Sequence, residues 1–152
     1  MALTKKQKTI KFLTPIVLPF FRLYWRVFKP ETFGVKVIIE HNGEYLWVRN
    51  SYGHRSITFP GGGIDKGETS EEAGKREVKE EVGLNLEEIK YVGKIVSTRE
   101  GKIDNIDIYY THSNSKDITL SEFEIEEGGW FRKDNPPKLS PTTEEIWEVY
   151  VV

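Results

Sequence analysis

The 152-residue sequence contains no cysteine and only three histidines, His41, His54 and His112. Without cysteine the chain cannot form a disulfide, a thiolate zinc site or a thiol nucleophile. The three histidines are too far apart in the sequence to form a local pair of ligands, so we do not expect a multi-histidine metal centre. We therefore expect any bound metal ion to be held by oxygen ligands.

The apolar segment near the N-terminus is too short to cross a bilayer. It is an uncharged run of ten residues, 12–21, whereas a spanning helix needs roughly 20. It follows a lysine-rich start, but the small-residue cleavage site of a secretory signal does not appear before Arg22. A cytoplasmic protein is the expectation.

The formal net charge of -2 conceals an uneven distribution. Residues 1–33 contain seven Lys or Arg and one acidic residue, whereas residues 34–152 contain 15 basic and 23 acidic residues. Nonspecific binding to nucleic acid needs clustered cations that neutralise phosphates, so we expect no bulk nucleic-acid binding by the acidic part. The length is that of one average domain. The sequence thus predicts a basic, apolar arm at 1–33 and one domain at 34–152.

Six segments rich in β-branched and aromatic residues are typical of strands. Asn42-Gly43 separates the first two and favours a tight hairpin turn. The turn at residues 100–102 predicts a second hairpin. The expected strands are residues 33–40, 44–49, 57–59, 89–98, 103–111 and 126–132.

Two helices are expected in the domain. Thr69 and Glu72 form a capping box, and Gly83 is suited to a left-handed terminator, so the sequence predicts a helix at 70–82. Ser140-Pro141 predicts the start of a terminal helix, because proline is favoured at the first helical position. Strands therefore precede, surround and follow one central helix.

Three glutamates of the central helix, Glu77, Glu80 and Glu81, lie at i, i+3 and i+4 and share one face. Such carboxylates repel one another, and a divalent cation reverses that cost. A solvated acidic face is the ordinary interpretation of a Glu-rich helix. Here, however, Glu68 and Arg76 are placed to brace the cluster, and the glycines at 62 and 63 let a main-chain carbonyl approach it. Such oxygen donors suit Mg²⁺ or Mn²⁺.

Residues 62–84 resemble the Nudix box, G-x5-E-x7-R-E-U-x-E-E-x-G-U with U aliphatic, and match every specified position. The similarity extends to Phe59-Pro60-Gly61 before the box and to residues 124–131 after it. The resemblance implies an α/β fold, a Nudix-type α/β/α sandwich with a mixed β-sheet and a loop-helix-loop catalytic element.

The resemblance also implies Mg²⁺- or Mn²⁺-dependent hydrolysis of a nucleoside diphosphate linked to another group. Glu77, Glu80 and Glu81 would be metal ligands, together with the carbonyl of Gly62. Glu77 or a nearby carboxylate would act on the attacking water, and Arg76 and Glu68 would form a supporting pair. The alternative is a nucleotide-binding or regulatory module that keeps this fold without catalysis.

Residues outside the box support further, less specific predictions. Arg49 and Arg55 flank the loop at 51–54 and are candidates for phosphate binding, although surface arginines are commonly only solvated. Gly74 stands where such boxes usually have alanine, which indicates close packing on the sheet. Trp47 and Trp130 are expected in the core. A further acidic ligand or substrate contact is expected from one of four residues, Glu100, Asp104, Asp117 and Glu122.

The arm contains a possible helix between Pro19 and Pro30, with apolar and basic residues on different sides. Its apolar side is expected to be covered, either by the domain or by a second subunit in a homodimer. A peripheral contact of residues 1–30 with an anionic membrane is the alternative. The apolar positions are Phe20, Phe21, Tyr24, Val27 and Phe28, and the basic ones are Arg22, Arg26 and Lys29.

Overall fold

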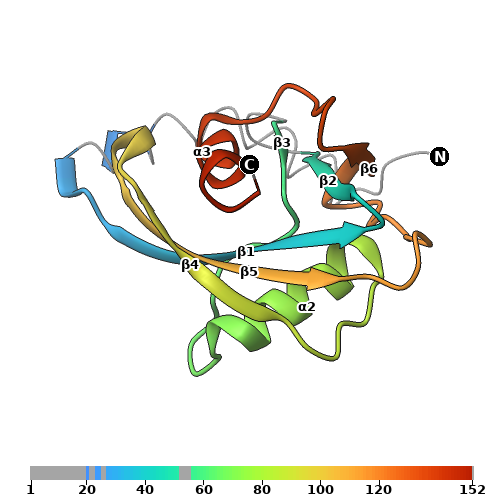
Figure 1. Cartoon of the computed structure of the whole chain (residues 1–152). Helices are drawn as coiled ribbons and strands as arrows, with labels where there is room; N and C mark the ends of the chain where they lie inside the picture. The colour runs from blue at the N-terminus through green and yellow to red at the C-terminus, as the bar shows by residue number, and fades with distance from the viewer. Residues whose placement is uncertain (1–19, 21–22, 25–26, 52–55, 152) are drawn as a thin grey trace.

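A mixed β-sheet lies between two helices in the computed structural model, which describes residues 20, 23, 24, 27–51 and 56–151 (Figure 1). Helix α2 (Ser70–Val82) covers one face and helix α3 (Pro141–Tyr150) the other. The expected α/β/α sandwich is confirmed. The strands are β1 (Glu31–His41), β2 (Glu44–Asn50), β3 (Ile57–Thr58), β4 (Lys90–Ser97), β5 (Ile103–His112) and β6 (Ile125–Arg132).

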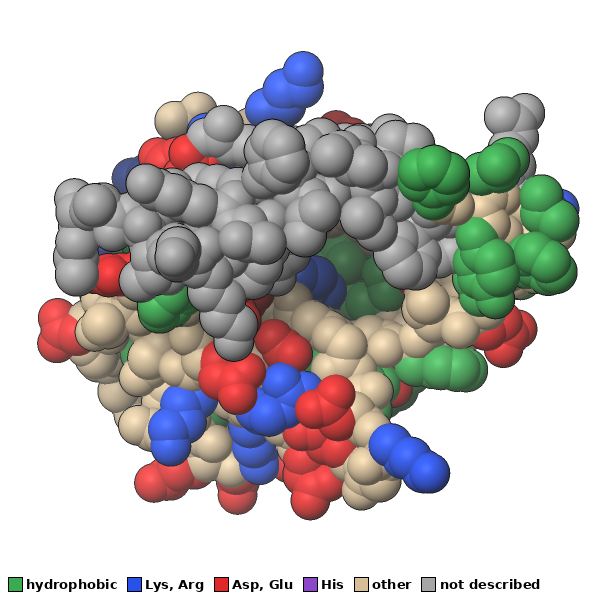
Figure 2. Space-filling model, turned by 180° about the vertical axis from the view of Figure 1, so that it is seen from behind, with side chains coloured by type: hydrophobic (Ala, Val, Ile, Leu, Met, Phe, Trp, Pro, Cys, Tyr) green, Lys and Arg blue, Asp and Glu red, His purple; other side chains and the backbone are tan. Residues whose placement is uncertain are grey.

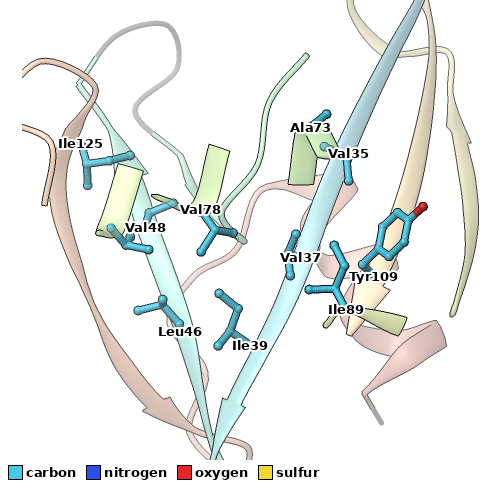
Figure 3. Packing of buried hydrophobic residues seen from close by; sticks show 11 residues of the cluster. Val35, Val37, Ile39, Leu46, Val48, Ala73, Val78, Ile89, Tyr109 and Ile125 are labelled. Atoms are coloured by element: carbon cyan, nitrogen blue, oxygen red, sulfur yellow. The ribbon is translucent and has the colours of Figure 1, made fainter. Parts of the chain in front are cut away.

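The strand order is β3-β2-β1-β5-β4, and β6 pairs with the other edge of β2 along its whole length, from Glu44 to Asn50. β1 runs parallel to β5 over its length, whereas it pairs with β2 only beside the hairpin turn, at Glu40–Tyr45 and His41–Glu44. Beyond that point β1 and β2 diverge (Figure 3). The divergence leaves one edge of β1 open for another segment.

The segment after β3 occupies this edge of β1. The N–H of Val35 donates to the carbonyl of Gly62, and the N–H of Val37 donates to the carbonyl of Pro60, each at 2.9 Å. Gly61 between them has φ +134°, and a Cβ there would lie 2.2 Å from the Val35 carbonyl oxygen. Only glycine fits this position, because it needs both the unusual φ and the missing side chain.

The local signals in the sequence are confirmed. Asn42 and Gly43 have φ values of 50° and 81°, as a tight hairpin turn requires. The Thr69 side chain accepts from the Glu72 N–H, the Glu72 side chain accepts from the Thr69 N–H, and Gly83 ends α2 at φ 73°. The Ser140 side chain accepts from the Thr143 N–H at the start of α3, and Pro141 is the first helical residue.

β1 begins at Glu31, two residues before the expected start, because its parallel register with β5 continues to Ile103. The expected boundary between arm and domain, at residues 33 and 34, therefore falls inside a strand. The other expected strand ends differ from the observed ones by no more than one residue, which is the usual uncertainty of such boundaries.

Two apolar clusters hold the helices to the sheet. The first lies under α2, and Figure 3 shows its side chains from β1, β2 and α2 pointing toward one another. The second lies under α3, where Trp47 is 1% exposed and stacks on Phe59 with ring centroids 4.4 Å apart. Trp47 is thus a core residue as expected. Trp130 is partly buried against the first cluster, and its ring N–H donates to the Lys116 carbonyl.

The described residues of the arm between 20 and 28 are helical, and their apolar side chains are exposed. The expectation that the domain covers the apolar side is therefore wrong for Phe20, Tyr24, Val27 and Phe28, whereas Phe21 lies outside the described residues. In the described part of the chain, no helix is long and apolar enough to span a membrane.

Gly74 lies where α2 approaches the sheet most closely. A Cβ at this position would lie 3.1 Å from Val37, 3.2 Å from Ile89 and 3.3 Å from Val35. Val35 and Val37 belong to β1, and Ile89 directly precedes β4. The close packing inferred from the sequence is confirmed.

We expect Gly74→Val to lower the free energy of unfolding by about 1–3 kcal/mol, because the branched side chain overpacks the contact between α2 and β1. Lys79→Val is the matched control, since Lys79 is exposed on the same helix and its change costs only about 0.5 kcal/mol of helix propensity. Urea denaturation of the two variants measures the difference. Equal losses would contradict the close packing of Gly74.

Candidate functional site

A cleft of about 570 Å³ opens where β1 and β2 diverge. Its walls are the first half of β1, the glycine segment at 61–63, one face of α2, residues 102–106 and Glu124. Figure 2 shows the hollow, with acidic and basic side chains gathered below it. A larger hollow of about 810 Å³ lies between residues 84–90 and 110–115, but it contains none of the motif's carboxylates.

Arg76 joins three carboxylates of the motif to the glycine segment. Its Nε and Nη2 donate to the two oxygens of Glu68 at 2.8 and 2.9 Å, and its Nη1 donates to Glu77 at 2.7 Å and to Glu80 at 3.3 Å. Nη2 also donates to the Gly63 carbonyl at 3.0 Å. The Arg76 guanidinium lowers the pKa of Glu68 to about 2, and the carboxylates raise the pKa of Arg76. The supporting pair expected from the sequence is therefore formed.

Glu81 is the buried carboxylate of the cluster, with 4% of its surface exposed. Its Oε2 accepts the Gly61 N–H at 2.9 Å. Burial raises the pKa of Glu81 to about 7, against the opposing effects of the Lys36 charge and the Gly61 N–H. Burial thus favours the neutral, protonated form of Glu81, whereas a cation nearby favours the charged form.

Lys36 is a residue of the cleft lining that the sequence did not single out. Its Nζ donates to the carbonyls of Phe59 and Gly61 at 3.0 and 2.7 Å, and burial lowers its pKa. Gly61 is thus held through its carbonyl by Lys36 and through its N–H by Glu81. A lysine between two valines of an apolar strand was the signal that could have identified it.

The donor set fits a hard divalent cation such as Mg²⁺. A Cβ on Gly62 would lie 2.6 Å from the Glu77 carboxyl group, so the carboxylate rests against bare main chain. The Gly62 carbonyl accepts the Val35 N–H and keeps a second lone pair. Among the described residues, no three acidic or histidine side chains are close enough to enclose an ion. Glu77 and Glu80 each accept a hydrogen bond from Arg76.

The acidic candidates outside the motif occupy different places. Asp104 lines the cleft, where Thr32 donates to it and Lys102 lies 3.0 Å away. Glu122 and Asp117 are exposed and do not line the cleft. The side chain of Glu100 lies outside what the structure describes.

Glu124 lines the cleft, although the sequence analysis did not single it out. Burial raises its pKa, and the charges of Glu77 and Glu80 act in the same direction. Its carbonyl accepts the Ser51 N–H at 2.8 Å, which ties the residue to the end of β2. Because this pairing joins distant segments, no local pattern identified Glu124.

Arg49, one of the two arginine candidates, does not line the cleft. Arg49 pairs with Glu127 at 3.3 Å and is absent from the lining, whereas the next residue, Asn50, contributes to it. Strand alternation explains the difference, because Arg49 shares the face of Trp47 beneath α3. Arg55 lies outside the described residues.

Comparisons with known proteins agree with this arrangement. The NUDIX domain family matches residues 29–150. An RNA pyrophosphohydrolase of Yersinia enterocolitica is 49% identical over 63 residues, which are 41% of this chain and 34% of that protein. The match thus spans about a third of the length of the curated relatives.

Solved structures share the fold. A MutT NUDIX hydrolase from Burkholderia pseudomallei is 25% identical with a TM-score of 0.73, covering 80% of this chain and 98% of that one. The NUDIX domain of Shewanella oneidensis NrtR, complexed with ADP ribose, is 16% identical with a TM-score of 0.68, covering 80% of this chain and 87% of that one. The second likeness shows the fold alone.

We expect Arg76→Gln to lower the free energy of unfolding by about 1–2 kcal/mol, because three carboxylates lose their shared hydrogen-bond donor. Arg76→Lys keeps the charge but not the bidentate contact, so its loss should be intermediate. Lys75→Gln is the control, since it removes the same charge from the exposed Lys75–Glu71 pair on the same helix. Chemical denaturation measures all three. An Arg76→Gln loss no larger than that of Lys75→Gln would contradict the bracing role.

Proposed function

The chain belongs to the Nudix family, whose domain spans residues 29–150, and we propose that it is a divalent-cation-dependent pyrophosphohydrolase. The proposed substrate is a nucleoside diphosphate linked to another group. The observation that carries the proposal is the complete carboxylate set, Glu77, Glu80 and Glu81, facing one cleft from one helix. Glu68 and Arg76 brace that set from the side.

In this proposal Glu77, Glu80, Glu81 and the Gly62 carbonyl hold Mg²⁺ or Mn²⁺. A cation bound there neutralises charge on the phosphate oxygens and makes a water molecule more acidic. The Glu77 carboxylate, or one beside it, would accept the proton of the attacking water as its oxygen bonds to phosphorus, while the bridging P–O bond of the anhydride breaks and the bridging oxygen leaves with the second product. Lys36 and Glu81 keep the Gly61 backbone in place, so the site is positioned before the substrate binds.

A nucleotide-sized substrate fits the site better than a long nucleic acid. The cleft of about 570 Å³ is in the size range of small-molecule sites. Residues 34–152 carry a net negative charge, whereas nonspecific binding to a phosphate backbone requires clustered cations. Among the similar proteins, one is named for RNA pyrophosphate hydrolysis and another is complexed with ADP ribose. The compounds in these two names share a phosphoanhydride next to a nucleoside. We propose that the substrate of this chain is a compound of this kind in the cytoplasm.

A nucleotide-binding module without catalysis is the competing function. Binding alone does not require three carboxylates to be crowded together, since their repulsion costs stability. The retention of the whole set, with its bracing arginine, favours the hydrolase.

We expect Mg²⁺- or Mn²⁺-dependent release of a nucleotide product from at least one member of a substrate panel. The panel comprises nucleoside triphosphates, dinucleoside polyphosphates, ADP-ribose, nucleotide sugars and a short RNA with a 5′-triphosphate. On the best substrate, Glu80→Gln and Glu81→Gln should each lower kcat at least about a hundredfold, because each removes charge from the cation site at nearly constant volume.

Glu71→Gln is the control in this assay, because Glu71 is exposed on the same helix and pairs with Lys75. Its kcat should stay within about twofold of the parent value. Absence of metal-dependent turnover across the panel would count against the hydrolase and favour the binding module. A normal kcat in Glu80→Gln, which is exposed and should fold normally, would remove Glu80 from the site.

A further inference from the structure

The arm presents an apolar helical face that nothing in the described structure covers. Its described residues 20, 23, 24, 27 and 28 are all helical and follow the i, i+3, i+4, i+7, i+8 spacing of one helix face. Phe20, Leu23, Tyr24, Val27 and Phe28 are exposed by 51% to 73%. We call these five residues the arm patch, and Figure 2 shows exposed hydrophobic side chains gathered at one side of the hollow. Such a cluster is costly in water and indicates a contact surface.

The basic residues near the arm patch indicate which kind of surface it contacts. The exposed Lys29 directly follows the patch, and the sequence adds Arg22 and Arg26 within the same stretch and four lysines before residue 12. Lys29 lies just past the helical residues, with φ 43°, and Arg22 and Arg26 lie outside the described residues. A segment that combines an exposed aromatic helix face with several basic residues has the composition of segments that lie on anionic bilayers.

A second copy of the chain is a poorer counterpart. A symmetric contact between two patches would bring two strongly basic arms together. The other exposed large apolar residues of the described domain include Tyr91 and Val96 on β4, Phe123 before β6 and Val149 on α3. They come from separate elements, so they do not provide a continuous aromatic acceptor comparable with the patch.

The arm is joined to the domain at a fixed point. The carbonyl of Pro30 accepts the Ile103 N–H at 3.1 Å, and β1 begins at the next residue. Phe33, two residues into β1, is 55% exposed and also lines the catalytic cleft. A surface that holds the arm patch therefore lies close to the mouth of the cleft.

We propose that the arm patch docks on the surface of an anionic lipid bilayer. The five apolar side chains enter the boundary between headgroups and acyl chains, and the basic residues of the arm face the lipid phosphates. The acidic domain stays in water, because its charge repels the same surface. Docking would hold the cleft near the membrane without a spanning segment. This inference does not depend on the proposed hydrolysis.

Sedimentation of the full chain with lipid vesicles tests the proposal without any nucleotide. We expect binding to vesicles that contain phosphatidylglycerol, little binding to pure phosphatidylcholine vesicles, and weaker binding as salt increases. The variant Phe20→Ser/Tyr24→Ser/Phe28→Ser should bind at least about tenfold more weakly because it removes the apolar contact. Phe123→Ser is the control, as it removes an equally exposed phenylalanine from the domain and should bind normally.

A second pair of variants tests the charge. Arg22→Gln/Arg26→Gln/Lys29→Gln should also weaken binding at least about tenfold, since each cation near an anionic surface contributes about fivefold. Lys90→Gln/Lys133→Gln/Lys138→Gln removes three exposed lysines of the domain and should leave binding unchanged. Circular dichroism establishes that each variant is folded.

Failure of the folded parent chain to bind phosphatidylglycerol vesicles would overturn the proposal. Equal loss of binding in the arm and domain charge variants would overturn it too, because the contact would then be unspecific. Concentration-dependent dimerisation in analytical ultracentrifugation, abolished by the aromatic variant while vesicle binding is absent, would assign the patch to a second copy instead.

Discussion

The insertion of the glycine segment along the open edge of β1 is the constraint on which the rest of the site depends. Val35 and Val37 fix the carbonyls of Gly62 and Pro60, and the steric demand at Gly61 allows no other residue there. The side chains of the site then contact this segment. Glu81 and Lys36 bind the two sides of Gly61, Glu77 rests against Gly62, and Arg76 reaches the carbonyl of Gly63. The sheet thus sets the position of the α2 carboxylates through main-chain contacts.

Local chemistry in the sequence was enough to predict the helix and its functional face. The capping box at Thr69 and the left-handed Gly83 bound α2, and the 3.6-residue period alone brings the glutamates together. The bidentate pairing of Arg76 with Glu68 was likewise predictable, because both belong to one motif with fixed spacing. The family resemblance supplied the order of the layers.

Features that depend on pairing between distant segments could not be predicted from one sequence. Glu124 reaches the cleft because the chain before β6 binds the end of β2, and Asp104 does so through the parallel register of β5 with β1. Arg49 does not line the cleft, because the alternation of β2 turns its side chain toward the face of Trp47. The exposure of the arm patch was also unexpected, since apolar helical faces are commonly buried against their own domain.

We expect the α2 carboxylates to form a divalent-cation site against the glycine segment. Titration with Mn²⁺, followed by the electron paramagnetic resonance signal of the free ion, tests this most directly because it needs no substrate. The account predicts that the parent chain binds Mn²⁺, that Glu77→Gln weakens binding at least about tenfold through loss of a charged ligand, and that Glu71→Gln binds as the parent does. Equal Mn²⁺ affinity in the parent chain and Glu77→Gln would contradict it.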